Sequence, residues 1–404
     1  MSPKPRPIVF RLPGQKPALY RHFHRIAWLA CALAFGVIVF GAFVRLSNAG
    51  LSCPDWPTCY GRATWPSAQA DVSGHAASAI RAFDDTRAWR EQVHRMLAGT
   101  LGVLVLVLAL LAAKREKFGL LQVLVAAVLV AVSIPLYMRG MHQPAALFAG
   151  LGEAILLFAS LRWFFHHGGG SVGHALPPIA ALTLAVIVFQ ALLGMWTVTL
   201  LLKPIVVMGH LLGGLATFGL LVSLAWRSTD RPMRVPDARL LRRLLAIGLV
   251  LLVLQIALGG WTSANYAALS CGTDFPKCVG QWMPPHDFRE GFVLWRGVGV
   301  DYEGGVLDGA ARIAIHIAHR TGALVVFLYL GWLATKLLRS PGLRGFGAML
   351  GLLLLAQVTL GILNVKLALP LHVAVMHNAG AALLLFTLVT LLARLRNPGE
   401  GHHP

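Results

Sequence analysis

Charged residues are scarce in this sequence, and acidic residues are the scarcest among them. Only 13% of the 404 residues are charged, and 35 Lys and Arg outnumber 16 Asp and Glu. A soluble globular domain carries about 25% charged residues, so the composition excludes an ordinary soluble protein. Cysteine is also scarce, at five residues. The N-terminal segment lacks a convincing small-residue cleavage site, so we expect no cleavable signal peptide.

Hydrophobic residues are abundant instead, at 57% of the chain. They gather in ten runs of roughly twenty residues, the length that crosses the hydrocarbon core of a bilayer. Because that core offers no water to the backbone, each run is predicted to form a helix. The sequence therefore predicts an all-α, polytopic membrane protein. The predicted helices span 26–45, 93–113, 119–137, 144–164, 177–200, 203–226, 241–262, 311–335, 345–364 and 371–395.

The net charge of +19 is unevenly distributed along the chain. With helices that alternate in direction, 21 of the 35 Lys and Arg fall in the tails and connections on the side of the N-terminus, whereas about eleven of the 16 acids fall on the other side. This asymmetry follows the positive-inside rule with both termini in the cytoplasm. We therefore expect a multi-pass protein of the bacterial inner (plasma) membrane, with no nucleic-acid partner.

One segment of the sequence occurs twice. Both copies begin with Leu-Ser-Cys and end with Asp-aromatic-Pro-x-Cys-x-Gly, at residues 51–61 and 269–280. Self-similarity of this kind indicates a repeated architecture. The copies lie in long outer connections, 46–92 and 263–310, on the predicted oxidising side. Disulfides are therefore expected for Cys53 with Cys59 and for Cys271 with Cys278. A metal site is less favoured, and whether the pairs are structural or redox-active stays open.

The histidines show the same duplication, together with an insertion. His94 matches His319, and a Gln-x-x-x-Gly motif begins twenty residues before both His210 and His377. His94 and His210 are 116 residues apart, whereas His319 and His377 are 58 residues apart. The additional residues in the first half are enough for two membrane helices. We expect two tandem four-helix bundles with a two-helix insertion in the first. The predicted boundaries are 1–25 for a cytoplasmic tail, 26–227 for the first bundle with its inserted hairpin at about 115–175, 228–240 for a cytoplasmic linker, 241–397 for the second bundle and 398–404 for a tail.

These four histidines are the candidate ligands. Ionisable residues within membrane helices are costly and mark functional sites. His94, His210, His319 and His377 each lie in an apolar stretch near the outer end of a helix, at equivalent positions in the repeat. Facing histidines in a four-helix bundle commonly hold haem through axial imidazoles. The sequence therefore predicts a haem site in each half. Structural histidines are the alternative, and zinc is disfavoured because the four are split between the halves.

Glu91 makes the two predicted sites unequal. It stands three residues before His94 and shares its helix face, whereas His316 occupies the matching position before the other repeat. A carboxylate beside one haem site suits proton transfer or stabilisation of a developing cation. We therefore expect reaction in the first half and electron transfer in the second. An interfacial carboxylate that pairs with Arg95 or Arg90 is the alternative.

Two arginines directly follow the repeated histidines. Arg95 and Arg320 are predicted to meet haem propionates as charge-assisted donors. The alternative is that both extend to the membrane interface, as long basic side chains commonly do.

Several motifs together resemble the haem A synthase family. They are 45–61 with its first Cys pair, Glu91-x-x-His94-Arg95, Thr197-Val198-Thr199 with His210-Leu211, Leu258-Gly259-Gly260-Trp261-Thr262 before the second Cys pair, His319-Arg320, and His377-Asn378-Ala379-Gly380. The resemblance covers most of 26–113 and 177–395 and excludes the inserted hairpin, where the chain departs from the usual eight-helix pattern. It implies that two successive hydroxylations convert the C8 methyl of haem O to the formyl group of haem A, which serves cytochrome oxidase.

The same resemblance implies roles for individual residues. His319 and His377 would hold a permanent haem b, His94 and His210 would hold substrate haem O, and Glu91 would be the catalytic carboxylate. The first Cys pair would assist electron or haem transfer. The implied partners are haem O, haem O synthase and an electron donor, with a homo-oligomer left open.

Two other classes of protein remain as alternatives. A b-type electron carrier with two haems should have equivalent environments at both histidine pairs, and the contrast between Glu91 and His316 argues against that. A haem or metabolite transporter should have broken helices and a cavity near the midplane, whereas the four histidines are expected nearer the outer face.

Overall fold

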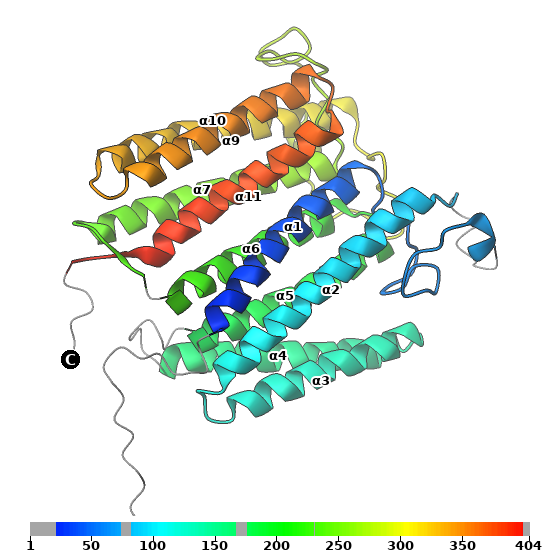
Figure 1. Ribbon diagram of the computed structural model, residues 1–404. Helices are drawn as coiled ribbons and strands as arrows, with labels where there is room; N and C mark the ends of the chain where they lie inside the picture. Colours follow the sequence, from blue (N-terminus) through cyan, green and yellow to red (C-terminus); the bar gives the residue numbers. More distant parts are fainter. Residues whose placement is uncertain (1–21, 74–81, 167–175, 230, 399–404) are drawn as a thin grey trace, which may run out of the picture.

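The computed structural model of the protein describes residues 22–73, 82–166, 176–229 and 231–398. Most of both predicted tails, 1–25 and 398–404, lies outside these ranges. Within the described ranges, ten helices are long and apolar enough to cross a membrane, and each overlaps one predicted run (Figure 1). The largest difference is at the helix Asp85–Ala113, which begins eight residues before the predicted start at 93. The prediction of an all-α, polytopic membrane protein is therefore confirmed.

The long helices pass back and forth between the two ends of the molecule. In the first half they are α1 (Phe23–Leu46), α2 (Asp85–Ala113), α3 (Gly119–Met138), α4 (His142–His166), α5 (Leu176–Thr199) and α6 (Pro204–Thr229). In the second half they are α7 (Ala238–Ala264), α9 (Gly309–Arg339), α10 (Arg344–Lys366) and α11 (Leu371–Arg394). Large apolar side chains such as Leu121, Val128 and Phe158 stay exposed on these helices, as lipid-facing surfaces require.

Four helices of each half pack around one another. The first helix group is α1, α2, α5 and α6, and the second helix group is α7, α9, α10 and α11. The groups meet where α11 packs against α1 and α6, and where α6 packs against α7 (Figure 1). At this junction the ring centroid of Trp28 lies 5.0 Å from that of Trp226 and 6.4 Å from that of Phe386. The division of the chain into units at 228–240 stays a prediction.

The inserted helices α3 and α4 form a hairpin at the edge of the first helix group. They pack against each other, and α3 also contacts α2 while α4 contacts α5 (Figure 1). Gly152 permits the close approach, because a Cβ there would lie 2.9 Å from the carbonyl oxygen of Ala126. Within the described residues, the first half therefore contains two more long helices than the second half.

The helices that carry the repeated His-Arg motif, α2 and α9, begin at capping aspartates. The Asp84 carboxylate accepts from the N–H of Arg87 at 3.0 Å, and the Asp308 carboxylate accepts from the N–H of Ala311 at 2.8 Å. Such caps satisfy donors that have no partner within the helix. Hydrogen bonds from the Thr86 hydroxyl and the Arg87 N–H lower the pKa of Asp84. These caps fix the first residue of both helices.

The short elements were not predicted from the sequence. β1 (Met233–Arg234) and β2 (Leu395–Arg396) form a parallel pair that joins the connection between the halves to the end of α11. The outer connections contain η2 (Gln69–Asp71) and α8 (Phe288–Gly291). Elements of two to four residues are too short for a detectable hydrophobic period.

Candidate functional site

A cavity of about 1920 Å³ runs between the two helix groups. Pockets that hold one small molecule measure roughly 300–1,000 Å³, so this cavity has room for two large ligands. Most of its wall is apolar. The four candidate histidines and Glu91 all line it. The structure therefore brings the predicted site residues of both halves to one chamber.

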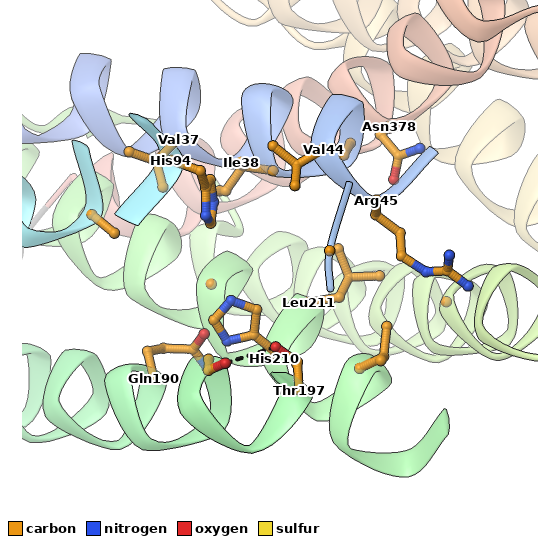
Figure 2. Close-up of a pocket in the computed structure, with 18 of the residues that line it drawn as sticks. Val37, Ile38, Val44, Arg45, His94, Gln190, Thr197, His210, Leu211 and Asn378 are labelled. Carbon is orange, nitrogen blue, oxygen red and sulfur yellow. Dashed lines mark hydrogen bonds between the residues drawn. The ribbon is translucent and has the colours of Figure 1, made fainter. Parts of the chain in front are cut away.

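The histidines come from α2, α6, α9 and α11 and fall into two pairs. His94 and His210 lie within electrostatic reach of each other, as do His319 and His377. Figure 2 shows the rings of His94 and His210 projecting into the pocket from opposite walls. The Nδ1 atoms of His210 and His377 are buried without a hydrogen-bond partner. Paired imidazoles with unpartnered nitrogens in an apolar chamber fit the axial ligation of haem iron.

A glycine of the neighbouring helix lies against each imidazole. Cβ atoms at Gly41, Gly194, Gly259 and Gly361 would lie 2.7, 3.3, 3.1 and 3.2 Å from the nearest ring atom of His94, His210, His319 and His377, respectively. Side chains rarely approach each other this closely, so these positions accommodate the rings because they are glycines. The four glycines therefore help to set the positions of the four imidazoles.

Each Cys pair closes a small loop at the outer end of its helix group. Cys53 and Cys59 form a disulfide with Cα atoms 4.7 Å apart, and Cys271 and Cys278 form one with Cα atoms 4.6 Å apart. The predicted pairing is therefore confirmed. We call residues 53–61 the first Cys loop and residues 271–280 the second Cys loop.

Glu91 joins the first Cys loop to α2. Its Oε2 accepts from the main-chain N–H groups of Ser52 at 2.7 Å and Cys53 at 2.8 Å, and its Oε1 accepts from Arg95 at 2.5 Å. The side chain is only 5% exposed. The pairing with Arg95, which was the alternative to a catalytic role for Glu91, is thus present, and the carboxylate also forms part of the cavity wall. The catalytic role stays a prediction.

Arg95 and Arg320 organise the two Cys loops. Arg95 donates to the carbonyl oxygens of Cys53, Asp55 and Thr58, and Arg320 donates to those of Asp274, Pro276 and Lys277. Sequence reasoning missed this contact because any residue can supply a carbonyl acceptor. Both arginines also line the cavity. The binding of haem propionates by either arginine stays a prediction.

His316 takes the place of Glu91 in the second half. Its Nδ1 lies 3.5 Å from the hydroxyl of Ser270, which is the counterpart of Ser52 in the repeat. The side chain is buried and lines the cavity. The chemical difference between the two halves therefore lies inside the chamber.

Gln255 is a cavity residue that sequence reasoning missed. Its Nε2 lies 2.9 Å from Nδ1 of His319. The signal was present, because Gln255 begins a third Gln-x-x-x-Gly motif that ends at Gly259. The two motifs recognised in the sequence begin at Gln190 and Gln357.

Arg45 is a second functional candidate for which sequence reasoning gave no role. From the end of α1 it donates to the hydroxyl of Tyr266 and to the carbonyl of Ser263, both at 3.0 Å. These contacts link the first helix group to the end of α7. Arg45 therefore supplies a cation to the cavity wall at the junction of the groups.

The fold and the site together define a class: a multi-pass membrane protein whose two helix groups enclose two histidine pairs. The family model COX15-CtaA, described as cytochrome oxidase assembly protein, matches residues 24–167 and 137–389. The chain belongs to this family, as its motifs indicated.

Proteins named heme A synthase are among the relatives of the chain. One from Shewanella oneidensis is 40% identical over 359 residues, which cover 88% of this chain and 91% of the relative. One from Roseobacter denitrificans is 27% identical over 406 residues, covering 92% and 89%. A third, from Methylobacterium nodulans, is 36% identical over 192 residues, covering 45% and 48%.

Proposed function

We propose that the protein is a haem A synthase, an oxidoreductase that converts the C8 methyl of haem O to a formyl group by successive hydroxylations. The observation that carries the proposal is the presence of two histidine pairs in one cavity, with Glu91 beside the first pair and His316 beside the second. Relatives that match along most of the chain bear the corresponding name.

In this proposal the two histidine pairs have different ligands. His94 and His210 hold the substrate haem O, and His319 and His377 hold haem b as a cofactor. When bound, haem b supplies electron transfer. The chain itself positions the imidazoles against glycines and surrounds both proposed haems with apolar side chains that exclude water.

Glu91 is proposed to hold or move a proton beside the substrate. It lies one helical turn before His94, and donors already occupy both of its oxygens, so its orientation is fixed before substrate arrives. A carboxylate that takes up a proton turns one acceptor oxygen into a donor. Protonation of Glu91 would therefore weaken its hold on the first Cys loop, which couples the proton to the position of that loop.

We also propose a location and an orientation. The protein lies in the bacterial inner membrane, with both Cys loops in the periplasm and both termini in the cytoplasm. Disulfides are typical of an oxidising compartment. Lys114, Arg115 and Lys117 occupy the connection at the opposite end of α2, in agreement with the positive-inside rule. Haem O synthase and an electron donor are the proposed partners, and the first Cys pair would assist electron or haem transfer.

Pigment extraction tests the proposal. The full chain is co-expressed with a source of haem O, and the extracted haems are separated. Wild type should accumulate haem A, and Glu91→Ala should abolish it while haem b stays bound. Glu290→Ala is the matched control, because this carboxylate pairs with Arg296 in an outer connection, and it should retain haem A. Bound haem b with unchanged haem O in the wild type would refute the proposal.

A further inference from the structure

The inserted hairpin of α3 and α4 lines part of the cavity. We call this part the side branch. Neither helix, both of which lie within the described residues, contributes an Asp, Glu, Lys or Arg to the cavity wall. The side branch is therefore uncharged along the hairpin. Most of the residues that the hairpin contributes there are small and apolar: Ala127, Ala131, Ala145, Ala146, Ala149 and Gly150.

The side branch and the first histidine pair lie on opposite faces of α2. Met96, Gly99 and Val103 of α2 also line the cavity. Val103 follows His94 by nine residues, which turns its side chain about 180° away from that of His94 on a helix with 3.6 residues per turn. One face of α2 therefore carries the proposed substrate ligand, and the other face borders the side branch.

Small residues line the way around α2 from one face to the other. Ala98 and Gly102 of α2 lie on the flank between the two faces, and both line the cavity together with Ala191 of α5. The helices α2 and α5 pack against each other, so large side chains on this flank would block the route. The cavity is therefore continuous from the first histidine pair to the side branch.

Side chains of the protein do not fill the side branch. A Cβ atom added at Gly99, Gly102 or Gly150 would have no heavy atom within 4 Å. Met96 and Val103 are 49% and 61% exposed, although they line the cavity. Figure 1 shows α2 and α3 close together at their shared turn and diverging from there toward the outer end. The hairpin thus encloses space that a ligand can occupy.

The side branch is long, and aromatic rings gather at its outer end. Along α3, the residues that line it extend from Ala126 to Tyr137, which is about 16 Å at a rise of 1.5 Å per residue. The ring centroid of Tyr137 lies 6.1 Å from that of Trp56 in the first Cys loop and 5.2 Å from that of His142. The space therefore has the shape that a chain requires rather than that of a second flat macrocycle.

A hydrocarbon chain attached to the substrate fits this space best. Haem O carries a farnesyl chain on its macrocycle, and haem b does not. Each contact between apolar atoms contributes little, but many such contacts along one wall add up. The second helix group has no counterpart of α3 and α4 within the described residues, which agrees with a haem that has no such chain.

We propose that the side branch holds the farnesyl chain of haem O while His94 and His210 hold the iron. The inference rests on the proposed function and adds how the first site distinguishes haem O from haem b. The inserted hairpin is then a specificity element of the substrate site. Binding of the chain makes and breaks no covalent bond.

Filling the route around α2 tests the proposal. The purified full chain is loaded with ferric haem O, and ferric haem b is added as a competitor. Gly102→Leu should lower the concentration of haem b that displaces half of the haem O by about tenfold or more, because the new side chain occupies the space that the farnesyl chain needs. Gly36→Leu is the matched control and should change nothing, since its Cβ also meets open space but Gly36 does not line the cavity.

A second pair of variants keeps the test decisive if Gly102→Leu binds no haem at all. Ala146→Phe fills the side branch from α4, whereas Ala154→Phe makes the same change on an exposed part of α4 outside the cavity. Ala146→Phe should weaken haem O and leave haem b in place. Unchanged competition would overturn the proposal and leave the side branch to a membrane lipid, and equal loss of both haems in Ala146→Phe alone would also overturn it. These measurements need no oxidation of haem O, so they can fail while the wild type still makes haem A.

Discussion

Gly361→Ala would place a methyl group against the imidazole of His377. The new Cβ would lie 3.2 Å from Cε1 of the ring, whereas carbon atoms are in optimal contact at about 3.5–4.0 Å. The ring or α10 must therefore move by roughly 0.3–0.8 Å. Ligand distances at metal sites are held to about 0.2 Å, so the displacement exceeds what the proposed bond between His377 and haem iron would tolerate. We expect haem affinity at this site to fall about 10–100-fold, or about 1.4–2.8 kcal/mol.

Gly351→Ala is the matched control, because it makes the same substitution in the same helix. Its Cβ would meet Ala334 at 3.9 Å, an ordinary contact. Alanine in a helix interior is favoured over glycine by roughly 0.5–1 kcal/mol, so the control should keep its haem and unfold at a slightly higher temperature. The assay is haem per chain, the ferric low-spin spectrum and thermal unfolding. If Gly361→Ala keeps the haem content and spectrum of the wild type, the glycine does not position the ligand.

Asp84→Ala should lower the free energy of unfolding by about 1 kcal/mol at neutral pH, measured in detergent. Because folding lowers the pKa of Asp84, the difference from wild type should be complete above the ordinary aspartate pKa and should be lost as the pH falls through the lowered pKa of the folded state, and a pH-independent difference would contradict the assignment. Arg320→Ala should speed amide hydrogen exchange in the second Cys loop, whereas Arg289→Ala should not; equal exchange in both would argue against the docking contact. Gly152→Ala should push α3 from α4 at a cost of about 1–3 kcal/mol, and Gly150→Ala, with open space at its Cβ, should not. Equal thermal stability of these two variants would exclude the close approach as the reason for Gly152.

The helices and the histidine positions could be predicted because they leave strong marks in the sequence. Bilayer thickness imposes a run length on every spanning helix, and all ten runs correspond to helices. The duplication places His94 and His319 in equivalent contexts, and both line the cavity. The contrast between Glu91 and His316 was likewise visible as a difference between aligned repeats.

Contacts between distant segments were harder to predict. The contact of Arg320 with a haem propionate stays a prediction, but the hydrogen bonds from its guanidinium to main-chain carbonyls about 45 residues earlier in the sequence were not foreseen. No residue type marks a carbonyl acceptor, so this docking has no sequence signature. Gln255 was missed for another reason, because its motif lies in an apolar helix and was recognised only in its two other copies. The role of the glycines that face the imidazole rings could be recognised only once the positions of the helices in space were known.

The shared chamber has an electrochemical consequence. Charges interact more strongly across an apolar protein interior than across water. Both histidine pairs line a single, mostly apolar cavity, so an electron added at one proposed haem would be felt at the other. The midpoint potential of either haem should therefore depend on whether its neighbour is present and reduced. Titrations of singly loaded protein would then differ from those of the doubly loaded form.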